Sequence, residues 1–381
     1  MVYTAPSGMV ESRTENLLAQ GGTTVKKVLK IILIVLLVIV VLAAGYLVYV
    51  FAAFHRFGSG EIPVTGETGR SAPAGAETPI ELVSWNIGFG AYEADYGFFM
   101  DGGTQSWAWS KERLDANLGR ICGELRGYDA DLYLIQEVDT DSTRSYHVDE
   151  RAPLLGALNE GRAWTFAKNY DSPFLMYPLT QPHGASKAGV MTFSRFDIAL
   201  AQRVELPIES GVTKLLDLDR CYSRQEIPVD GGGTLVLYNL HLSAYTSDGT
   251  IATQQLRLLL EDMQAEYEKG NWCVAGGDFN KDLLGDSSKY FGKADKTYTW
   301  AMPIPPETFD GVDISLVAPL DEANPVPSCR NADGPYHAGQ YTLTVDGFLV
   351  SENVGVLAAE VVDTGFAYSD HNPVRLRFTL N

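Results

Sequence analysis

From about residue 80 to the C-terminus, short apolar runs alternate with amphipathic stripes. The runs are rich in β-branched and aromatic residues, which predicts strands. They lie at residues 80–85, 131–136, 188–194, 234–242, 271–277, 341–351 and 374–380. Apolar residues three or four positions apart predict helices from Leu114 to Leu125 and from Leu256 to Tyr267. Strands alternating with helices indicate an α/β domain.

The most apolar part of the chain is a run of 24 uncharged residues, from Ile31 to Phe54. As a helix it would reach about 36 Å, enough to cross a bilayer core of about 30 Å. A cleavable signal peptide is the main alternative, but its apolar region is usually only about 7–15 residues long. A buried core helix is a weaker alternative, since no polar stripe interrupts the run. We therefore predict one transmembrane anchor.

Three lysines, Lys26, Lys27 and Lys30, precede the run, and only Arg56 follows it closely. The positive-inside rule then places the N-terminus in the cytoplasm and the rest outside the cell membrane. The segment 57–79 is dense in Gly, Pro, Ser and Thr, which is typical of a flexible linker. The expected organisation is a cytoplasmic polar and basic tail (1–27), the anchor (28–56), the linker (57–79) and one catalytic domain (80–381).

The net charge differs in sign between the N-terminal segment that contains the anchor and the rest of the chain. The formal net charge of −19 combines +3 in residues 1–56 with −22 in the remaining 325 residues. Such acidity argues against a broad basic face for nucleic acid, although a local basic cleft would escape this count. Composition also excludes a largely disordered chain, because 45% of the residues are hydrophobic and only 20% are charged.

The four cysteines occur singly, without a C-x-x-C pair, so structural zinc is not expected. An external location would permit a disulfide. Cys122 and Cys273, however, lie on an apolar helix face and in an apolar strand pattern, which favours buried free thiols.

Polar residues collect at the ends of the predicted strands, where ligands of α/β proteins bind. These are Asn86, Glu137, Asn239, His241, Asp278, Asn280, Asp346, Asp370 and His371. Each one alone has a structural interpretation: a turn or helix cap for the Asn and Asp residues, a solvated strand end for Glu137, a buried structural imidazole for His241. The whole set is harder to explain in this way.

Carboxylate and amide oxygens suit a hard cation such as Mg²⁺ or Mn²⁺. Two histidines, one of them directly after an Asp, supply groups that activate water or protonate a leaving oxygen. Together they are matched to metal-assisted hydrolysis of a phosphate ester.

The ordered strings SWN, IQE, AGVMTFSR, NLHL, GGDFN, TVDGFLVS and SDHNPV resemble the endonuclease/exonuclease/phosphatase superfamily. This superfamily includes pancreatic-type deoxyribonucleases, apurinic endonucleases, neutral sphingomyelinases and inositol polyphosphate phosphatases. The resemblance covers residues ~80–381 and implies a four-layer α/β sandwich: two packed mixed sheets flanked by helices, here preceded by one transmembrane helix. It suggests a membrane-anchored member of bacterial type.

The resemblance also implies roles for individual residues. Metal ligands would be Asn86, Glu137 and Asp370, with Glu137 the principal one. His371, held by Asp346, would be the base or would stabilise the transition state. Asp278 would orient or deprotonate the attacking water, so two candidates for the base stay open. His241 would contact phosphate or act as the acid, and Asn280 and Asn239 would bind substrate.

Arg144, seven residues after Glu137, is a further candidate from the residues themselves, because a guanidinium there could clamp a phosphate. The alternative is a solvated loop arginine beside Asp141. No obligate protein partner is expected.

The expected activity is Mg²⁺- or Mn²⁺-dependent hydrolysis of a phosphodiester or phosphomonoester by in-line attack of water. The substrate could be a phospholipid head group, a nucleotide or nucleic acid, including extracellular DNA or RNA. Two other classes stay open: a catalytically silent module that binds a phosphorylated ligand, and a structural envelope protein.

Overall fold

The computed structural model describes residues 8–54, 56–68, 78–208, 219–244 and 250–381, with side chains from Val25 onward. The chain divides into two units, 1–53 and 54–381. The first contains one helix, α1 (Gly8–Ala53). Its part from Val25 to Ala53, 29 residues long, is apolar enough to cross a membrane. Helix-forming residues such as Glu, Leu and Ala extend α1 back to Gly8, where the polar composition predicted only a tail.

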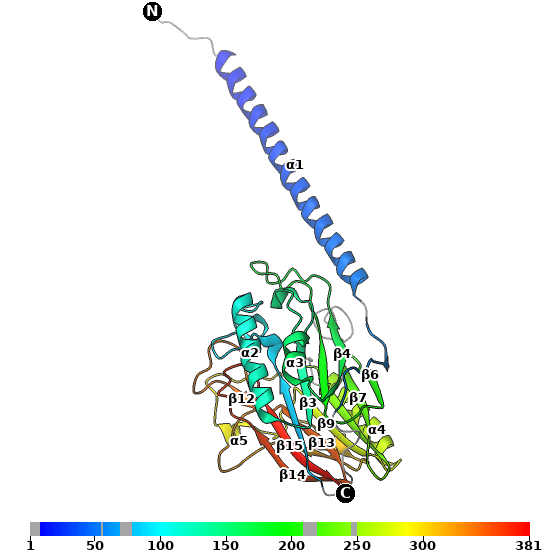
Figure 1. Cartoon of the computed structure of the whole chain (residues 1–381). Coiled ribbons are helices and arrows are strands. Elements are labelled where there is room, and N and C mark those ends of the chain that lie inside the picture. Colours follow the sequence, from blue (N-terminus) through cyan, green and yellow to red (C-terminus); the bar gives the residue numbers. More distant parts are fainter. Residues whose placement is uncertain (1–7, 55, 69–77, 209–218, 245–249) are drawn as a thin grey trace, which may run out of the picture. The chain divides into compact units, whose positions relative to one another are not determined.

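The second unit is built on two mixed sheets (Figure 1). The first sheet has the order β1-β6-β7-β8-β9-β13-β10. Its strands are β1 (Gly60–Glu61), β6 (Leu200–Glu205), β7 (Cys221–Pro228), β8 (Thr234–His241), β9 (Trp272–Asp278), β13 (Asp346–Ser351) and β10 (Ile314–Val317). Strands β8 and β9 are parallel, whereas the other neighbours in this sheet are antiparallel.

The second sheet has the order β14-β15-β2-β3-β5-β4. Its strands are β14 (Val354–Val361), β15 (Val374–Leu380), β2 (Ile80–Asn86), β3 (Leu132–Asp139), β5 (Lys187–Ser194) and β4 (Ala163–Asp171). Only β2 and β3 run parallel. A separate two-stranded ribbon pairs β11 (Cys329–Arg330) with β12 (Thr342–Leu343).

Helices cover the outer faces of both sheets. A core of residues such as Leu114, Ile121 and Leu154 packs α2 (Lys111–Tyr128) and α3 (Arg151–Leu158) on the second sheet. A second core packs α4 (Thr250–Tyr267) on the first sheet, and a third, with Leu134 and Phe348, lies between the sheets. The other described elements are one short helix, α5 (Ser288–Phe291), and 3-10 turns at Gly88–Gly90, Phe99–Asp101, Thr143–Ser145 and Pro306–Phe309. The expected four-layer sandwich is confirmed.

All seven predicted strand segments contain strands, but 341–351 is interrupted. Its first part forms β12 and its second part forms β13, which begins at Asp346. Between them, Val345 accepts a hydrogen bond from the Phe279 amide, so the chain changes partners there. The four cysteines are free and buried, as predicted.

The first part of the expected linker is not a free tether, because its backbone pairs with strands of the domain. Gly60 and Glu61 pair with Arg203 and Gln202 of β6, and Thr65 pairs with Trp164. These bonds satisfy the edges of two sheets, which would otherwise expose unpaired backbone groups. Residues 69–77 of the expected linker lie outside the described residues.

Candidate active site

The polar strand ends meet at one end of the two sheets. His241 and Asp278 are the last residues of the parallel strands β8 and β9, and they stand opposite each other in register. Asp346, the first residue of antiparallel β13, is the register partner of Asp278 on its other side. Asn86 ends β2 in the other sheet. The topology therefore brings together residues up to 260 positions apart, from Asn86 to Asp346.

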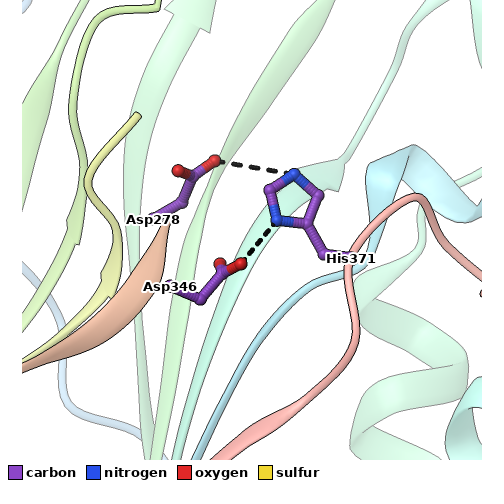
Figure 2. A group of neighbouring side chains, drawn as sticks. All are labelled: Asp278, Asp346 and His371. Carbon is purple, nitrogen blue, oxygen red and sulfur yellow. Dashed lines mark hydrogen bonds and ion pairs between the residues drawn. The ribbon is translucent and has the colours of Figure 1, made fainter. Parts of the chain in front are cut away.

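His371 and Asp346 form a buried pair (Figure 2). Nδ1 of His371 lies 2.8 Å from Oδ2 of Asp346. The same oxygen accepts a hydrogen bond of 2.7 Å from the Ser328 hydroxyl, which fixes the carboxylate. Nε2 of His371 therefore faces away from Asp346, 3.8 Å from Oδ2 of Asp278 and 3.6 Å from Sγ of Cys329.

Asp278 is the centre of the group. Its Oδ2 accepts a hydrogen bond of 3.1 Å from Nδ2 of Asn86 and lies 3.4 Å from Nε2 of His241. Its Oδ1 accepts one of 2.8 Å from the backbone amide of Asn280. This carboxylate thus stands between two imidazoles and is oriented by donors from β2 and from its own turn.

Burial and neighbouring charges shift the pKa values of these groups in different directions. Burial alone would lower the pKa of His371, but Asp346 and other anionic neighbours outweigh it and raise that pKa well above its usual value. Burial, with a contribution from Asp346, raises the pKa of Asp278 to about 7. Burial and the Arg220 guanidinium lower the pKa of His241 well below its usual value, so His241 is neutral.

Glu137 reaches the site because β3 contains a bulge. The pairing of β3 with β5 shifts between Ile135 and Val138, and Glu137 has a left-handed φ of 55°. A bulge of this kind redirects a side chain beside a site. Oε1 of Glu137 accepts a hydrogen bond of 3.2 Å from Nδ2 of Asn86.

Glu137 and Asp370 line the same cavity. Burial raises the pKa of Asp370 to about 6, and repulsion from Glu137 adds to this effect. Two carboxylates that line one cavity and repel each other fit a divalent cation, which would offset both charges. Asn86 directs Nδ2 rather than Oδ1 at the carboxylates, so it would ligate a cation only after a half-turn of its amide.

A second acidic group could also hold a metal ion. Ligand atoms of Asp278, Asp346 and His371 lie within 4.8 Å of one another. Two of them are already paired, since His371 Nδ1 is bonded to Asp346. We therefore interpret this group as a His-Asp pair beside a carboxylate, and Glu137 with Asp370 as the better cation site.

Of the residues expected to bind substrate, Asn280 lines the cavity and Asn239 does not. Asn280 has a φ of 50°, and its Nδ2 donates to the Leu242 carbonyl. Asn239 lies two residues deeper in β8 than His241, between the sheets. Its Nδ2 donates to the Met191 carbonyl and Thr192 hydroxyl, and its Oδ1 accepts from Gln136. The structure thus places Asn239 away from the cavity, where its hydrogen-bonding groups join the two sheets.

Arg144 lines the cavity but is neither solvated nor paired with Asp141. Its Nε and Nη2 donate to the two oxygens of buried Asp139, at 3.0 and 2.9 Å. Its guanidinium also stacks on the Phe89 ring, with 3.9 Å between Cζ and the ring centroid. The bidentate pair fixes the guanidinium in the cavity wall.

Six polar residues of this wall were not predicted from the sequence: Asp101, Asn169, His183, Arg220, Arg330 and Asn331. Asn169 sits in a second bulge, where the pairing of β4 with β5 shifts between Lys168 and Tyr170. Among the described residues, Nδ2 of Asn169 and Nδ1 of His183 are buried without a hydrogen-bond partner. Nη1 of Arg220 donates to the His241 carbonyl at 3.3 Å. The alternating pattern of β4 (AWTFAKN) could have indicated the strand, but not its bulge.

The comparisons with known proteins agree with this geometry. The profile described as "Endonuclease/Exonuclease/phosphatase family" matches residues 83–371, a range that includes every residue of the site described above. The chain belongs to this family. Members of the endonuclease/exonuclease/phosphatase family hydrolyse phosphoester bonds, so the chain is placed among these hydrolases.

Solved structures of the endonuclease/exonuclease/phosphatase family share the fold. A protein from Beutenbergia cavernae is 18% identical with a TM-score of 0.52, covering 80% of this chain and 72% of its own. One from Leptotrichia buccalis is 12% identical with a TM-score of 0.52, covering 78% and 99%. One from Bacteroides vulgatus is 15% identical with a TM-score of 0.50, covering 80% and 100%. No curated protein matches significantly.

Proposed function

We propose that the chain is a membrane-anchored, Mg²⁺- or Mn²⁺-dependent phosphodiesterase. The observation that carries the proposal is a single cavity lined by His371, Asp278 and His241 together with the carboxylates Glu137 and Asp370. A module that only binds a phosphorylated ligand has no need of a buried His-Asp pair next to a second carboxylate. The geometry therefore favours hydrolysis over binding alone.

The cation would be held by Glu137 and Asp370, with Asn86 as a third ligand after rotation of its amide. When bound, such a cation offsets charge on the phosphoryl oxygens and lowers the pKa of a bound water. Asn86 holds both Glu137 and Asp278 in place through Nδ2.

The residues around the phosphorus would divide the proton chemistry. Asp278 is held by Asn86 and by the Asn280 amide, and it would orient the attacking water and accept its proton. Asp346 keeps His371 oriented through Nδ1, so that Nε2 would donate to a phosphoryl oxygen and stabilise the transition state. Neutral His241 would donate a hydrogen bond to the phosphate or to the leaving oxygen. Asn280 would bind a phosphoryl oxygen.

For the topology, we propose a cytoplasmic N-terminus and an extracellular catalytic domain. Three lysines before the uncharged run that starts at Ile31, against Arg56 after it, support this orientation. Protease added to intact cells should then remove the catalytic domain, and protection of the domain would reverse the topology.

The activity test is a panel of substrates with the full chain in detergent: plasmid DNA, sphingomyelin, phosphatidylinositol phosphates, nucleotides and bis(p-nitrophenyl) phosphate, each with and without EDTA. We expect hydrolysis of at least one substrate, lost with EDTA and lost in His371→Ala. His337→Ala is the matched control, since His337 is exposed and outside the cavity. Full activity of His371→Ala would contradict the assignment.

A further inference from the structure

The loop between β4 and β5 exposes large apolar side chains in an acidic domain. Leu179 is 82% exposed and Tyr177 68%, and Phe174 and Met176 are exposed as well. Residues 172–186, here called the apolar loop, contain no Asp, Glu, Lys or Arg. Soluble proteins rarely gather such residues on one surface loop without a partner.

The apolar loop has an ordered base. Leu175 and Gly184 exchange two backbone hydrogen bonds of 3.0 Å, and the Ser172 amide donates to the Ser186 carbonyl at 2.9 Å. The Trp107 indole donates to the Pro182 carbonyl at 2.7 Å. The exposed side chains are thus presented on a preformed hairpin, which lowers the entropic cost of binding.

The chain that follows α1 joins the domain next to this loop. Arg56 donates through Nε to Asp219 and through Nη2 to the Leu206 carbonyl, both at 2.7 Å. The Phe57 ring lies 4.9 Å from Nζ of Lys168 in β4. Lys168 is four residues before the first residue of the apolar loop. The predicted anchor therefore enters the domain at the same end of β4 as the apolar loop.

The cavity reaches that end of β4 too. Asn169 and Tyr170 lie between Lys168 and the apolar loop, His183 belongs to the loop, and all three line the cavity. Phe99, whose neighbour Met100 lines the cavity, packs on Tyr177 with 5.8 Å between ring centroids. Anchor attachment, exposed apolar side chains and substrate cavity converge on one end of the domain.

We propose that the apolar loop inserts Phe174, Met176, Tyr177 and Leu179 into the surface of the membrane that holds α1. Aromatic and aliphatic side chains without charge are suited to this interfacial region. A second part of the proposal rests on the proposed phosphodiesterase function. The substrate is then a phosphoester carried by a lipid in that surface.

The first test does not depend on activity. A nitroxide label is attached to Leu179→Cys in the full chain, which is then reconstituted in phosphatidylcholine/phosphatidylglycerol vesicles. The four native cysteines are buried, so the label should react with the introduced cysteine. Leu357→Cys, an exposed apolar position on β14, is the matched control. We expect the Leu179→Cys label to be relaxed by oxygen and shielded from a water-soluble nickel complex, and the control label to be relaxed by the nickel complex. Equal nickel access at both positions would overturn the proposal, and so would shielding from both reagents, which indicates a protein partner such as a second copy.

The second test addresses the substrate class. The variant Phe174→Ser/Met176→Ser/Tyr177→Ser/Leu179→Ser is compared with wild type on phospholipid vesicles and on soluble bis(p-nitrophenyl) phosphate. We expect at least about a tenfold loss on vesicles with soluble hydrolysis unchanged. Equal loss on both substrates, or no loss on vesicles, would overturn the lipid substrate. Absence of hydrolysis in wild type would instead reject the phosphodiesterase function and leave the labelling result standing.

Discussion

Oδ2 of Asp346 accepts a hydrogen bond from the Ser328 hydroxyl while it lies 2.8 Å from Nδ1 of His371. The carboxylate is thereby fixed on one side and fixes the imidazole on the other, leaving Nε2 toward the cavity. The pair is buried, so its charge interaction is little screened by solvent.

Replacing Asp346 with Asn should preserve the shape of this pair and remove its negative charge. We expect kcat to fall about 10²- to 10⁴-fold, the range typical of a lost acid–base partner, because His371 loses the anion that favours its charged form. The measurement is kcat on bis(p-nitrophenyl) phosphate, with circular dichroism to verify folding. A kcat within about twofold of wild type would show that the pair is only structural.

Replacing Glu137 with Gln should weaken cation binding more than folding. The variant keeps the size of the side chain but removes one of the two repelling carboxylates. We expect the Mg²⁺ concentration for half-maximal activity to rise at least about tenfold. Glu360→Gln, at an exposed position on β14, is the control and should leave the Mg²⁺ dependence unchanged. An unchanged dependence for Glu137→Gln would move the cation site elsewhere, with Asp278, Asp346 and His371 as the next candidates.

Replacing Asn169 with Leu separates recognition from stability. Nδ2 of Asn169 is buried and has no hydrogen-bond partner in the part of the chain that the structure describes. A buried donor of this kind costs about 1–3 kcal/mol, so its removal should stabilise the protein by about 1 kcal/mol. If this amide binds substrate, KM should rise at the same time. Urea unfolding and steady-state kinetics measure the two effects. As a contrast, Asn117→Leu should destabilise, because Nδ2 of Asn117 donates to the Gly90 and Tyr368 carbonyls.

Arg144→Lys should affect both stability and KM. Lysine cannot reproduce the bidentate bond to Asp139, and we expect about 2 kcal/mol or more of lost stability. Nη1, the guanidinium nitrogen not bonded to Asp139, would contact a substrate phosphate, so KM should rise about fivefold. An unchanged KM together with lost stability would remove Arg144 from substrate binding.

His183 gives a pH dependence of stability. Burial lowers its pKa to about 3, against about 6.5 in an unfolded chain. Between these values the unfolded chain binds a proton that the folded protein does not, so stability falls as the pH is lowered from about 6.5. The slope is about 1.4 kcal/mol per pH unit, or about 2 kcal/mol between pH 6.5 and 5. His183→Gln should lack this contribution in urea unfolding at several pH values, while His337→Gln should retain it; parallel curves for wild type and His183→Gln would contradict the assignment.

The strand pattern predicted an α/β domain, the family resemblance of the ordered strings implied the sandwich, and the polar strand ends nominated residues that do meet in one cavity. What the sequence could not indicate depends on pairing across strands. Asn239 and His241 share one face of β8 and are two residues, about 7 Å, apart. That distance is enough to place His241 at the cavity and Asn239 between the sheets. Asn169 was missed because a bulge is defined by its partner strand. The docked residues 56–61 were missed because their Gly- and Ser-rich composition is the same for a free tether and for an edge strand.

The two bulges flank β5 at the same level, since Gly189 is the register partner of both Val138 and Lys168. One redirects Glu137 and the other redirects Asn169, from opposite sides of a single strand. Substitutions in β4 could therefore change the part of the cavity wall around Asn169 without moving the Glu137 carboxylate on β3. Deleting either extra residue would instead reverse the inward and outward alternation of the rest of its strand. Substrate preference in this scaffold is therefore open to point substitution, whereas the length of each bulged strand is not free to vary.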